Sequence, residues 1–300
     1  MIRGLSAFPL TPLRDDEIDE RAYAGLVERL AAAGVDSITA LGSTGSYAYL
    51  TLEERRRAAR IALAHAGDVT VLVGVGALRT AHVVALARDA EQLGAAGLLV
   101  APVSYQPLTD DDVLGLYEDL AAAVALPIVV YDNPGTTRFR FSDELYGRVA
   151  ALPTVTSIKI PAVPAEPSAA RARIDAIRAA VPERVGIGIS GDAAAATALV
   201  AGCDAWYSVI AGTAPAPAVA ITRAALAGDA EGALAESRRL QPLWDLFAAY
   251  GSVRVVAAIA ELAGLAARSS LPRPLVGLDE VDRRRVDAVV RELDLLPHET

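Results

Sequence analysis

Short apolar runs alternate with longer stretches of helical period along most of this chain. Eight such runs, rich in β-branched and aliphatic residues, recur about every thirty residues. They are residues 4–8, 37–41, 70–76, 97–102, 127–132, 155–160, 184–190 and 205–211. Eight strand-plus-helix units at this spacing predict an α/β fold, a (β/α)8 TIM barrel. A doubly wound sheet is the alternative, but neither a GxGxxG turn nor a Walker loop follows any of the runs.

Helical signals fill the segments between the runs and continue beyond the last one. Residues 51–66 are an example, with Thr51 as the expected N-cap and Glu54 as its capping-box partner. After the eighth unit about seventy residues remain, more than barrel closure needs. Three stretches there have helical periodicity, namely 229–250, 252–266 and 278–296. We therefore predict a barrel over residues 1–228 and a C-terminal three-helix appendage over residues 229–300, packed on the barrel.

Composition and charge exclude several classes of partner. A net charge of −9 and a pI near 4.9 argue against nucleic acid or an anionic membrane as partner. The single cysteine, Cys203, excludes an internal disulfide and suits a reducing compartment. No secretory leader or run of twenty apolar residues is recognisable, so we expect a cytoplasmic protein. His65, His82 and His298 have no metal-ligand spacing, and we expect no metal site.

One residue in the sixth apolar run does not fit its surroundings. Of the 28 basic residues only Lys159 is a lysine, and it lies between Ile158 and Ile160. A guanidinium stays protonated, whereas an amine can lose its proton and attack a carbonyl to form a Schiff base. Lowering its pKa from about 10.4 to about 7 requires roughly 4 to 5 kcal/mol of destabilisation of the ammonium, which burial in a strand can supply. The alternative is a strand-end lysine whose stem packs while its head reaches water.

Chemistry in such a barrel lies at the carboxyl ends of the strands, which is where Lys159 falls. Tyr131 ends the preceding strand, and a phenol beside an amine can transfer protons while an imine forms. After the second strand, the glycines of "GSTGS" (42–46) allow a tight turn whose N–H groups suit a carboxylate. Each feature has a simpler interpretation, a packed tyrosine or an ordinary turn.

Several motifs together resemble one family of enzymes. They are "GSTGS" (42–46), "YDNPGTT" (131–137), "SIKI" (157–160) and "ISGDAAAATALVAGCDAWYSVIA" (189–211). In order and spacing they are similar to the motifs of the dihydrodipicolinate synthase / N-acetylneuraminate lyase family of class I Schiff-base aldolases. The likeness spans most of the chain, including the C-terminal helices.

The resemblance implies a (β/α)8 barrel that forms homotetramers from tight dimers and uses no metal or organic cofactor. It implies that Lys159 forms an imine with pyruvate or a related 2-oxo acid. Tyr131 would be the acid/base phenol, and Thr44 would relay its proton. Tyr105 would reach across a dimer interface to complete the relay. The backbone amides of Ser43 and Thr44 would hold the substrate carboxylate.

The chain departs from the family pattern around the second substrate. Ser46 replaces the usual glutamate of the turn, and Pro161 stands where sialic-acid lyases have a threonine. Thr136 stands where dihydrodipicolinate synthases place an arginine for the second substrate's carboxylate; Arg138 is a candidate substitute. Tyr207 stands where an isoleucine usually offers its carbonyl. The residues expected to bind substrate are Ser43, Thr44, Thr136, Arg138, Gly191 and Tyr207.

The leading hypothesis is a lyase or aldolase that makes or breaks a C–C bond between a 2-oxo acid and an aldehyde-like partner. A second hypothesis keeps the imine but couples it to dehydration of a sugar acid. A third, from another class, is a catalytically silent barrel serving as a binding or regulatory subunit; its mark would be loss of Lys159, Tyr131 or Thr44, all of which are present. A phosphate-binding barrel is supported only by a faint match of "ISGDA" and "IAGTA".

Overall fold

Eight parallel strands close into a barrel at the centre of the molecule. The structure is a computed structural model and describes residues 2–296. The strands, in chain order around the barrel, are β1 (Gly4–Ala7), β4 (Ser37–Ala40), β5 (Thr70–Gly74), β6 (Gly97–Val100), β7 (Ile128–Tyr131), β8 (Val155–Ile160), β9 (Gly186–Ile189) and β10 (Ala205–Ser208). Because β10 also pairs with β1, the sheet has no open edge. The predicted (β/α)8 barrel is confirmed.

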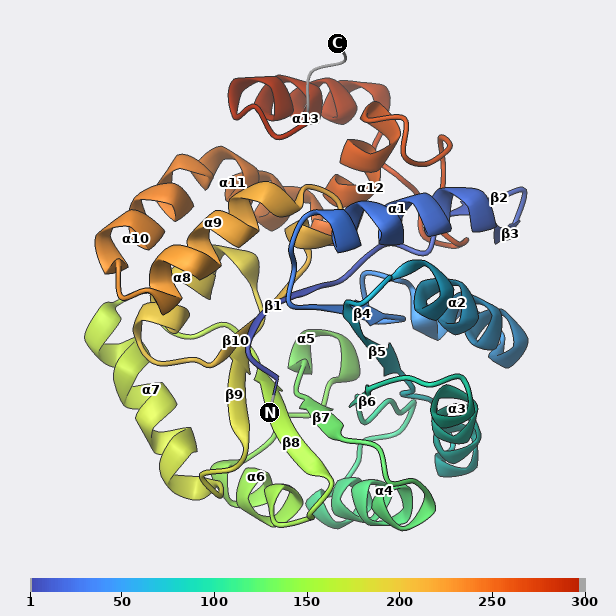
Figure 1. Cartoon of the computed structure of the whole chain (residues 1–300), viewed down its shortest axis with the longest axis vertical. Coiled ribbons are helices and arrows are strands. Elements are labelled where there is room, and N and C mark those ends of the chain that lie inside the picture. Colours follow the sequence, from blue (N-terminus) through green and yellow to red (C-terminus); the bar gives the residue numbers. More distant parts are fainter. Residues whose placement is uncertain (1, 297–300) are drawn as a thin grey trace.

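Helices surround the strands, as Figure 1 shows. They are α1 (Glu20–Ala32), α2 (Leu52–His65), α3 (Thr80–Gln92), α4 (Asp110–Ala123), α5 (Pro134–Thr137), α6 (Asp143–Ala150), α7 (Pro167–Ala180), α8 (Ala195–Val200) and α9 (Pro215–Leu226). The helix α2 begins with the predicted capping box, in which Thr51 and Glu54 bond each other's backbone N–H. A small hairpin of β2 (Leu13–Arg14) and β3 (Glu17–Ile18) precedes α1.

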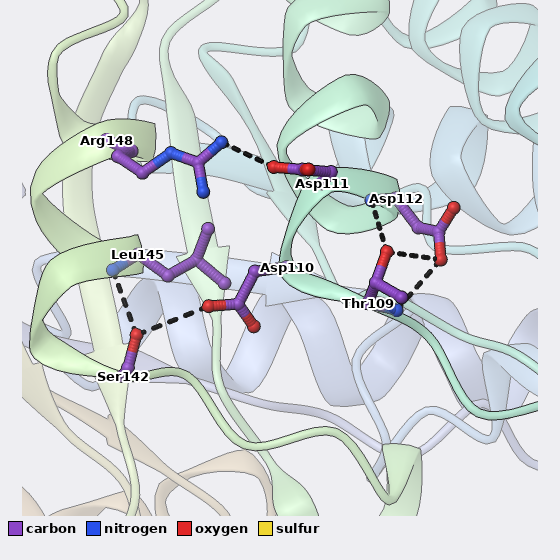
Figure 2. A network of polar contacts seen from close by, with 7 residues as sticks. All are labelled: Thr109, Asp110, Asp111, Asp112, Ser142, Leu145 and Arg148. Carbon is purple, nitrogen blue, oxygen red and sulfur yellow. Dashed lines mark hydrogen bonds and ion pairs between the residues drawn. The ribbon is translucent and has the colours of Figure 1, made fainter.

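The starts of α4 and α6 are joined by polar contacts, shown in Figure 2. Thr109 begins α4 with a capping box, and Ser142 caps α6 while its hydroxyl also donates to Asp110 at 3.5 Å. Arg148 forms an ion pair with Asp111 at 2.6 Å. These two helices follow the loops after β6 and β7, so the contacts fix where both loops end.

The barrel interior and the helix layer form separate cores. Alternation along β8 turns Ile158 and Ile160 outward into the core beneath the helices, while Ser157 and Lys159 point into the barrel. The interior core contains Phe8, Leu72, Leu99, Ala101, Val129, Tyr131, Ala205 and Tyr207. The apolar neighbours of Lys159 in the sequence therefore belong to the opposite face of its strand. Cys203 is a buried core residue.

The C-terminal region contains four helices within the described residues, where three were predicted. They are α10 (Ala230–Arg239), α11 (Gln241–Tyr250), α12 (Ser252–Leu262) and α13 (Glu280–Glu292). Pro242 occupies the first turn of α11, where its missing N–H costs nothing, so the stretch predicted as one helix is two. Helix α10 packs on α8 and α9. The division of the chain at residue 228 stays a prediction.

No single helix within residues 2–296 is long and apolar enough to cross a membrane. The consecutive helices α11 and α12 are long and apolar enough only when they are taken together, and the chain bends by 117° between them.

Candidate active site

Lys159 lies inside the barrel near the carboxyl end of β8. Its side chain is 3% exposed, and its Nζ lies 4.0 Å from the ring centroids of both Phe8 and Tyr131. Burial lowers the pKa of Lys159 below its ordinary value, and the smaller effects of Tyr131 and Asp192 oppose that shift. A lysine whose head reaches bulk water would not be enclosed in this way. The structure therefore excludes a lysine whose head reaches bulk water, and the burial of Lys159 favours the neutral amine.

Tyr131 is the direct neighbour of Lys159 across the sheet, because their Cα atoms are paired in the β7–β8 register. The phenol oxygen of Tyr131 accepts a hydrogen bond from Nδ2 of Asn133 at 2.7 Å and shares another with Oγ of Ser43 at 3.2 Å. Two fixed contacts hold the phenol beside the amine, which suits a group that passes protons.

The hydroxyl that contacts the phenol differs from the one expected. Thr44 was predicted to relay the proton of Tyr131, but the hydroxyl in contact with Tyr131 belongs to Ser43. The side chain of Thr44 forms no hydrogen bond with any residue from 2 to 296, and it lines the cavity above Lys159. The relay role of Thr44 stays a prediction, and Ser43 is a second candidate for it because its hydroxyl contacts the phenol.

Two glycines let the backbone of the turn after β4 lie close to neighbouring residues. A Cβ on Gly42 would lie 2.5 Å from the ring of Phe8, and one on Gly45 would lie 3.2 Å from the backbone nitrogen of Leu41. The N–H groups of Ser43 and Thr44 form no hydrogen bond within the described part of the chain. Ser43, Thr44 and Lys159 line the same cavity, and binding of a carboxylate by the two N–H groups stays a prediction.

Asp192, which we did not assign a role from the sequence, lines the cavity and is buried. Its carboxylate accepts hydrogen bonds from Nε1 of Trp206 and from the backbone N–H groups of Val209 and Ile210, at 2.7 to 3.1 Å. Burial raises its pKa, while these three donors favour the charged form. The carboxylate joins the loops after β9 and β10. The "SGD" motif contained this signal.

Two further predicted residues, Gly191 and Tyr207, also line the cavity. Gly191 has φ of 89°, a conformation that favours glycine. The hydroxyl of Tyr207 shares a hydrogen bond of 2.8 Å with Ser157, and its ring packs edge-on against Phe8. Gly188 leaves room for this ring, since a Cβ there would lie 2.3 Å from it. Tyr207 thus fills the barrel interior below the lysine with an aromatic ring.

The remaining predicted residues lie at or beyond the rim. Thr136 lines the cavity. Arg138 does not; it ends the short helix α5 in a left-handed conformation with φ of 59° and is exposed. A contact between Arg138 and substrate therefore stays a prediction, which requires this side chain to move into the cavity. Tyr105, in the loop after β6, is 90% exposed and also lies outside the cavity.

The cavity measures about 590 Å³ and opens at the carboxyl end of the barrel. Loops after five strands and helices α11 and α12 line it. Within residues 2–296 no group of three or more His, Cys, Asp or Glu side chains is arranged to hold a metal ion. His65 lies in the last turn of α2 and His82 in the first turn of α3, away from the cavity, while His298 lies outside the described residues.

A parallel (β/α)8 barrel with a buried lysine and a tyrosine on adjacent strands defines a carbon–carbon lyase of the class I aldolase type. The chain belongs to the dihydrodipicolinate synthetase family, whose model matches residues 1–293. It is 33% identical to 4-hydroxy-tetrahydrodipicolinate synthase of Phenylobacterium zucineum, with 99% of both chains covered. The corresponding enzyme of Alcanivorax borkumensis is 34% identical, with the same coverage. A solved dihydrodipicolinate synthase from Agrobacterium tumefaciens is 46% identical and superposes with a TM-score of 0.93, covering 97% of this chain and 98% of that one.

Proposed function

We propose that Lys159 forms an imine with pyruvate or a related 2-oxo acid, and that the derived enamine makes or breaks a C–C bond to an aldehyde. The observation that carries this proposal is the buried Nζ of Lys159 beside the ring of Tyr131, on paired positions of adjacent strands. A binding barrel without turnover has no need for a buried amine with a lowered pKa.

The reaction proceeds in four steps. The neutral Nζ of Lys159 adds to C2 of pyruvate, and the resulting carbinolamine loses its hydroxyl as water with a proton from Tyr131, leaving the imine. The phenolate of Tyr131 then takes a proton from C3, which gives the enamine and restores the phenol. C3 of the enamine bonds to the aldehyde carbon, and the aldehyde oxygen takes up the proton of the Tyr131 phenol. Water finally hydrolyses the imine, which releases a 4-hydroxy-2-oxo acid and restores the amine of Lys159.

The carboxylate of the 2-oxo acid is held by the turn after β4. The free N–H groups of Ser43 and Thr44 lie at the same end of the cavity as Lys159 and can donate to both carboxylate oxygens. The hydroxyl of Thr44 is a further donor there. This contact places C2 beside the amine, which converts imine formation into an effectively intramolecular step.

The proton of Tyr131 is passed on by Ser43 and, in an oligomer, by Tyr105 of a second copy of the chain. The exposed phenol of Tyr105 is available for this role. Three other large apolar side chains, Tyr49, Leu52 and Leu78, are also exposed on the loops and helix starts after β4 and β5. Their exposure supports a dimer formed through this face and, from the family resemblance, a homotetramer in the cytoplasm.

Borohydride trapping tests the proposal sharply because the chain has one lysine. The purified protein is incubated with pyruvate or other 2-oxo acids, reduced with borohydride, digested and weighed by mass spectrometry. We expect the peptide containing Lys159 to gain the mass of the reduced adduct, and Lys159→Arg to gain none. An adduct at the N-terminal amine alone, or none with any 2-oxo acid, would contradict the proposal.

A further inference from the structure

The charges in the cavity indicate what kind of aldehyde it accepts. We infer that the second subsite takes an aldehyde whose substituent is uncharged and apolar, an inference that rests on the proposed function. The lining contains only two charged side chains, Lys159 and Asp192. The amine of Lys159 forms the imine, and both carboxylate oxygens of Asp192 already accept hydrogen bonds from N–H donors. Neither can pair with a carboxylate on the aldehyde.

Within residues 2–296 no other cationic side chain lines this cavity. Thr136 stands where the family resemblance leads one to expect an arginine for a second carboxylate. Arg138 is turned outward by its left-handed backbone. Arg254 lines a neighbouring cavity of about 400 Å³ instead, and its Nε donates to the carbonyl of Val276 at 3.0 Å. A carboxylate-bearing aldehyde would therefore lose its hydration without gaining a partner.

Most polar side chains of the lining are already bonded within the protein. The hydroxyl of Ser190 donates to the carbonyl of Ile160 at 2.8 Å, and the amide of Asn133 donates to Tyr131. The hydroxyl of Thr136 makes a longer contact of 3.4 Å with the Asn133 carbonyl. These groups are less available to a hydroxylated sugar chain, for which the hydroxyls of Thr44 and Ser252 remain in the lining.

Helix α11 contributes an aromatic surface to the same cavity. Trp244 and Phe247 line it with ring centroids 5.6 Å apart, and the indole N–H of Trp244 is used by the carbonyl of Ser237. Trp244 is buried, so the partly exposed ring of Phe247 is the aromatic face left for a ligand. Small apolar residues complete this part of the lining, namely Pro134, Pro161, Ala162, Ala193, Ala194 and Ala248. An apolar substituent gains by burial against such a surface.

The reaction then joins C3 of pyruvate to the carbon of an apolar aldehyde. One C3–H bond breaks and one C–C bond forms, the aldehyde oxygen takes up a proton equal to the one lost from C3, and water hydrolyses the imine to return the oxygen of the 2-oxo group. The product is a 4-hydroxy-2-oxo acid with the apolar group on C4. No oxidant or reductant is required.

A panel of aldehydes with pyruvate tests the inference. We would compare kcat/KM for 2-methylpropanal and benzaldehyde with that for succinic semialdehyde, aspartate 4-semialdehyde and glyceraldehyde. The apolar aldehydes should be favoured by about tenfold or more, the scale of discrimination by apolar contacts. Faster turnover of either carboxylate-bearing aldehyde, or of the polyhydroxylated one, would overturn the inference while the proposed function stands.

Two variants and a control test whether Phe247 and Thr136 set the preference among aldehydes. Phe247→Ala should lower kcat/KM for benzaldehyde about tenfold. Thr136→Arg should raise kcat/KM for succinic semialdehyde by a similar factor, because a guanidinium pairs with a carboxylate. Leu226→Ala, at a half-exposed position on α9, is the matched surface control and should change neither.

Pyruvate trapping by borohydride separates the two claims. Each variant must retain the Lys159 adduct, which shows that it is folded and that imine formation is intact. If the adduct persists but Phe247→Ala leaves the aldehyde preference unchanged, the aromatic subsite is wrong. If wild-type protein forms no adduct, the proposed function fails and this inference fails with it.

Discussion

The two ends of the cavity are built differently. At the inner end, Lys159 and Tyr131 stand on adjacent strands whose backbones are locked in a closed ladder, and both side chains are buried. At the outer end, Phe247 and Ala248 come from α11, outside the barrel, and are half-buried or exposed. Strands fix the geometry on which imine chemistry depends. A helix added after the barrel shapes the region that meets the second substrate, where substitutions cost the fold less. Chemistry and specificity are thus encoded in different parts of the chain.

Replacing the amine of Lys159 should cause the largest loss of turnover. This loss should arise at the inner end of the cavity. Lys159→Arg keeps the charge but cannot form an imine, so turnover should fall by roughly four orders of magnitude or more. Circular dichroism and thermal melting should still report a folded barrel. Lys159→Met, which removes the buried cation altogether, is the control in case the guanidinium does not fit. Residual activity near wild type in both variants would rule out covalent catalysis.

Removing the hydroxyl of Tyr131 should cause the second-largest loss of rate. Tyr131→Phe keeps the ring beside Lys159 but loses the hydroxyl that contacts Ser43 and Asn133. Imine formation with pyruvate should slow by roughly two to four orders of magnitude, measured by rapid quench with borohydride. An unchanged rate would remove the phenol from the mechanism.

The smallest of the three effects tests which hydroxyl of the turn relays protons. Ser43→Ala removes the bond to Tyr131 and should slow proton transfer about five- to thirtyfold, the scale of one hydrogen bond. Thr44→Val keeps shape and backbone N–H and should affect the rate less. A larger loss of rate in Thr44→Val than in Ser43→Ala would instead assign the proton relay to Thr44, as expected from the sequence.

Periodicity predicted every barrel strand, because each strand buries a recognisable apolar run. The lone lysine stood out because its residue type is unusual for its position, and Tyr131 was singled out only because it ends the strand before that of Lys159. The features that the sequence did not indicate depend on conformation within single turns. Which of Ser43 and Thr44 faces the phenol, and where Arg138 points, is set by local φ and ψ angles that residue type alone does not fix. The break at Pro242 could have been read from the sequence.

A crystal structure of the protein soaked with pyruvate tests the central claim most directly. We predict continuous electron density from Nζ of Lys159 to C2 of pyruvate, with the carboxylate against the turn at Ser43 and Thr44. Pyruvate bound elsewhere, or an unmodified amine beside an occupied cavity, would contradict the account.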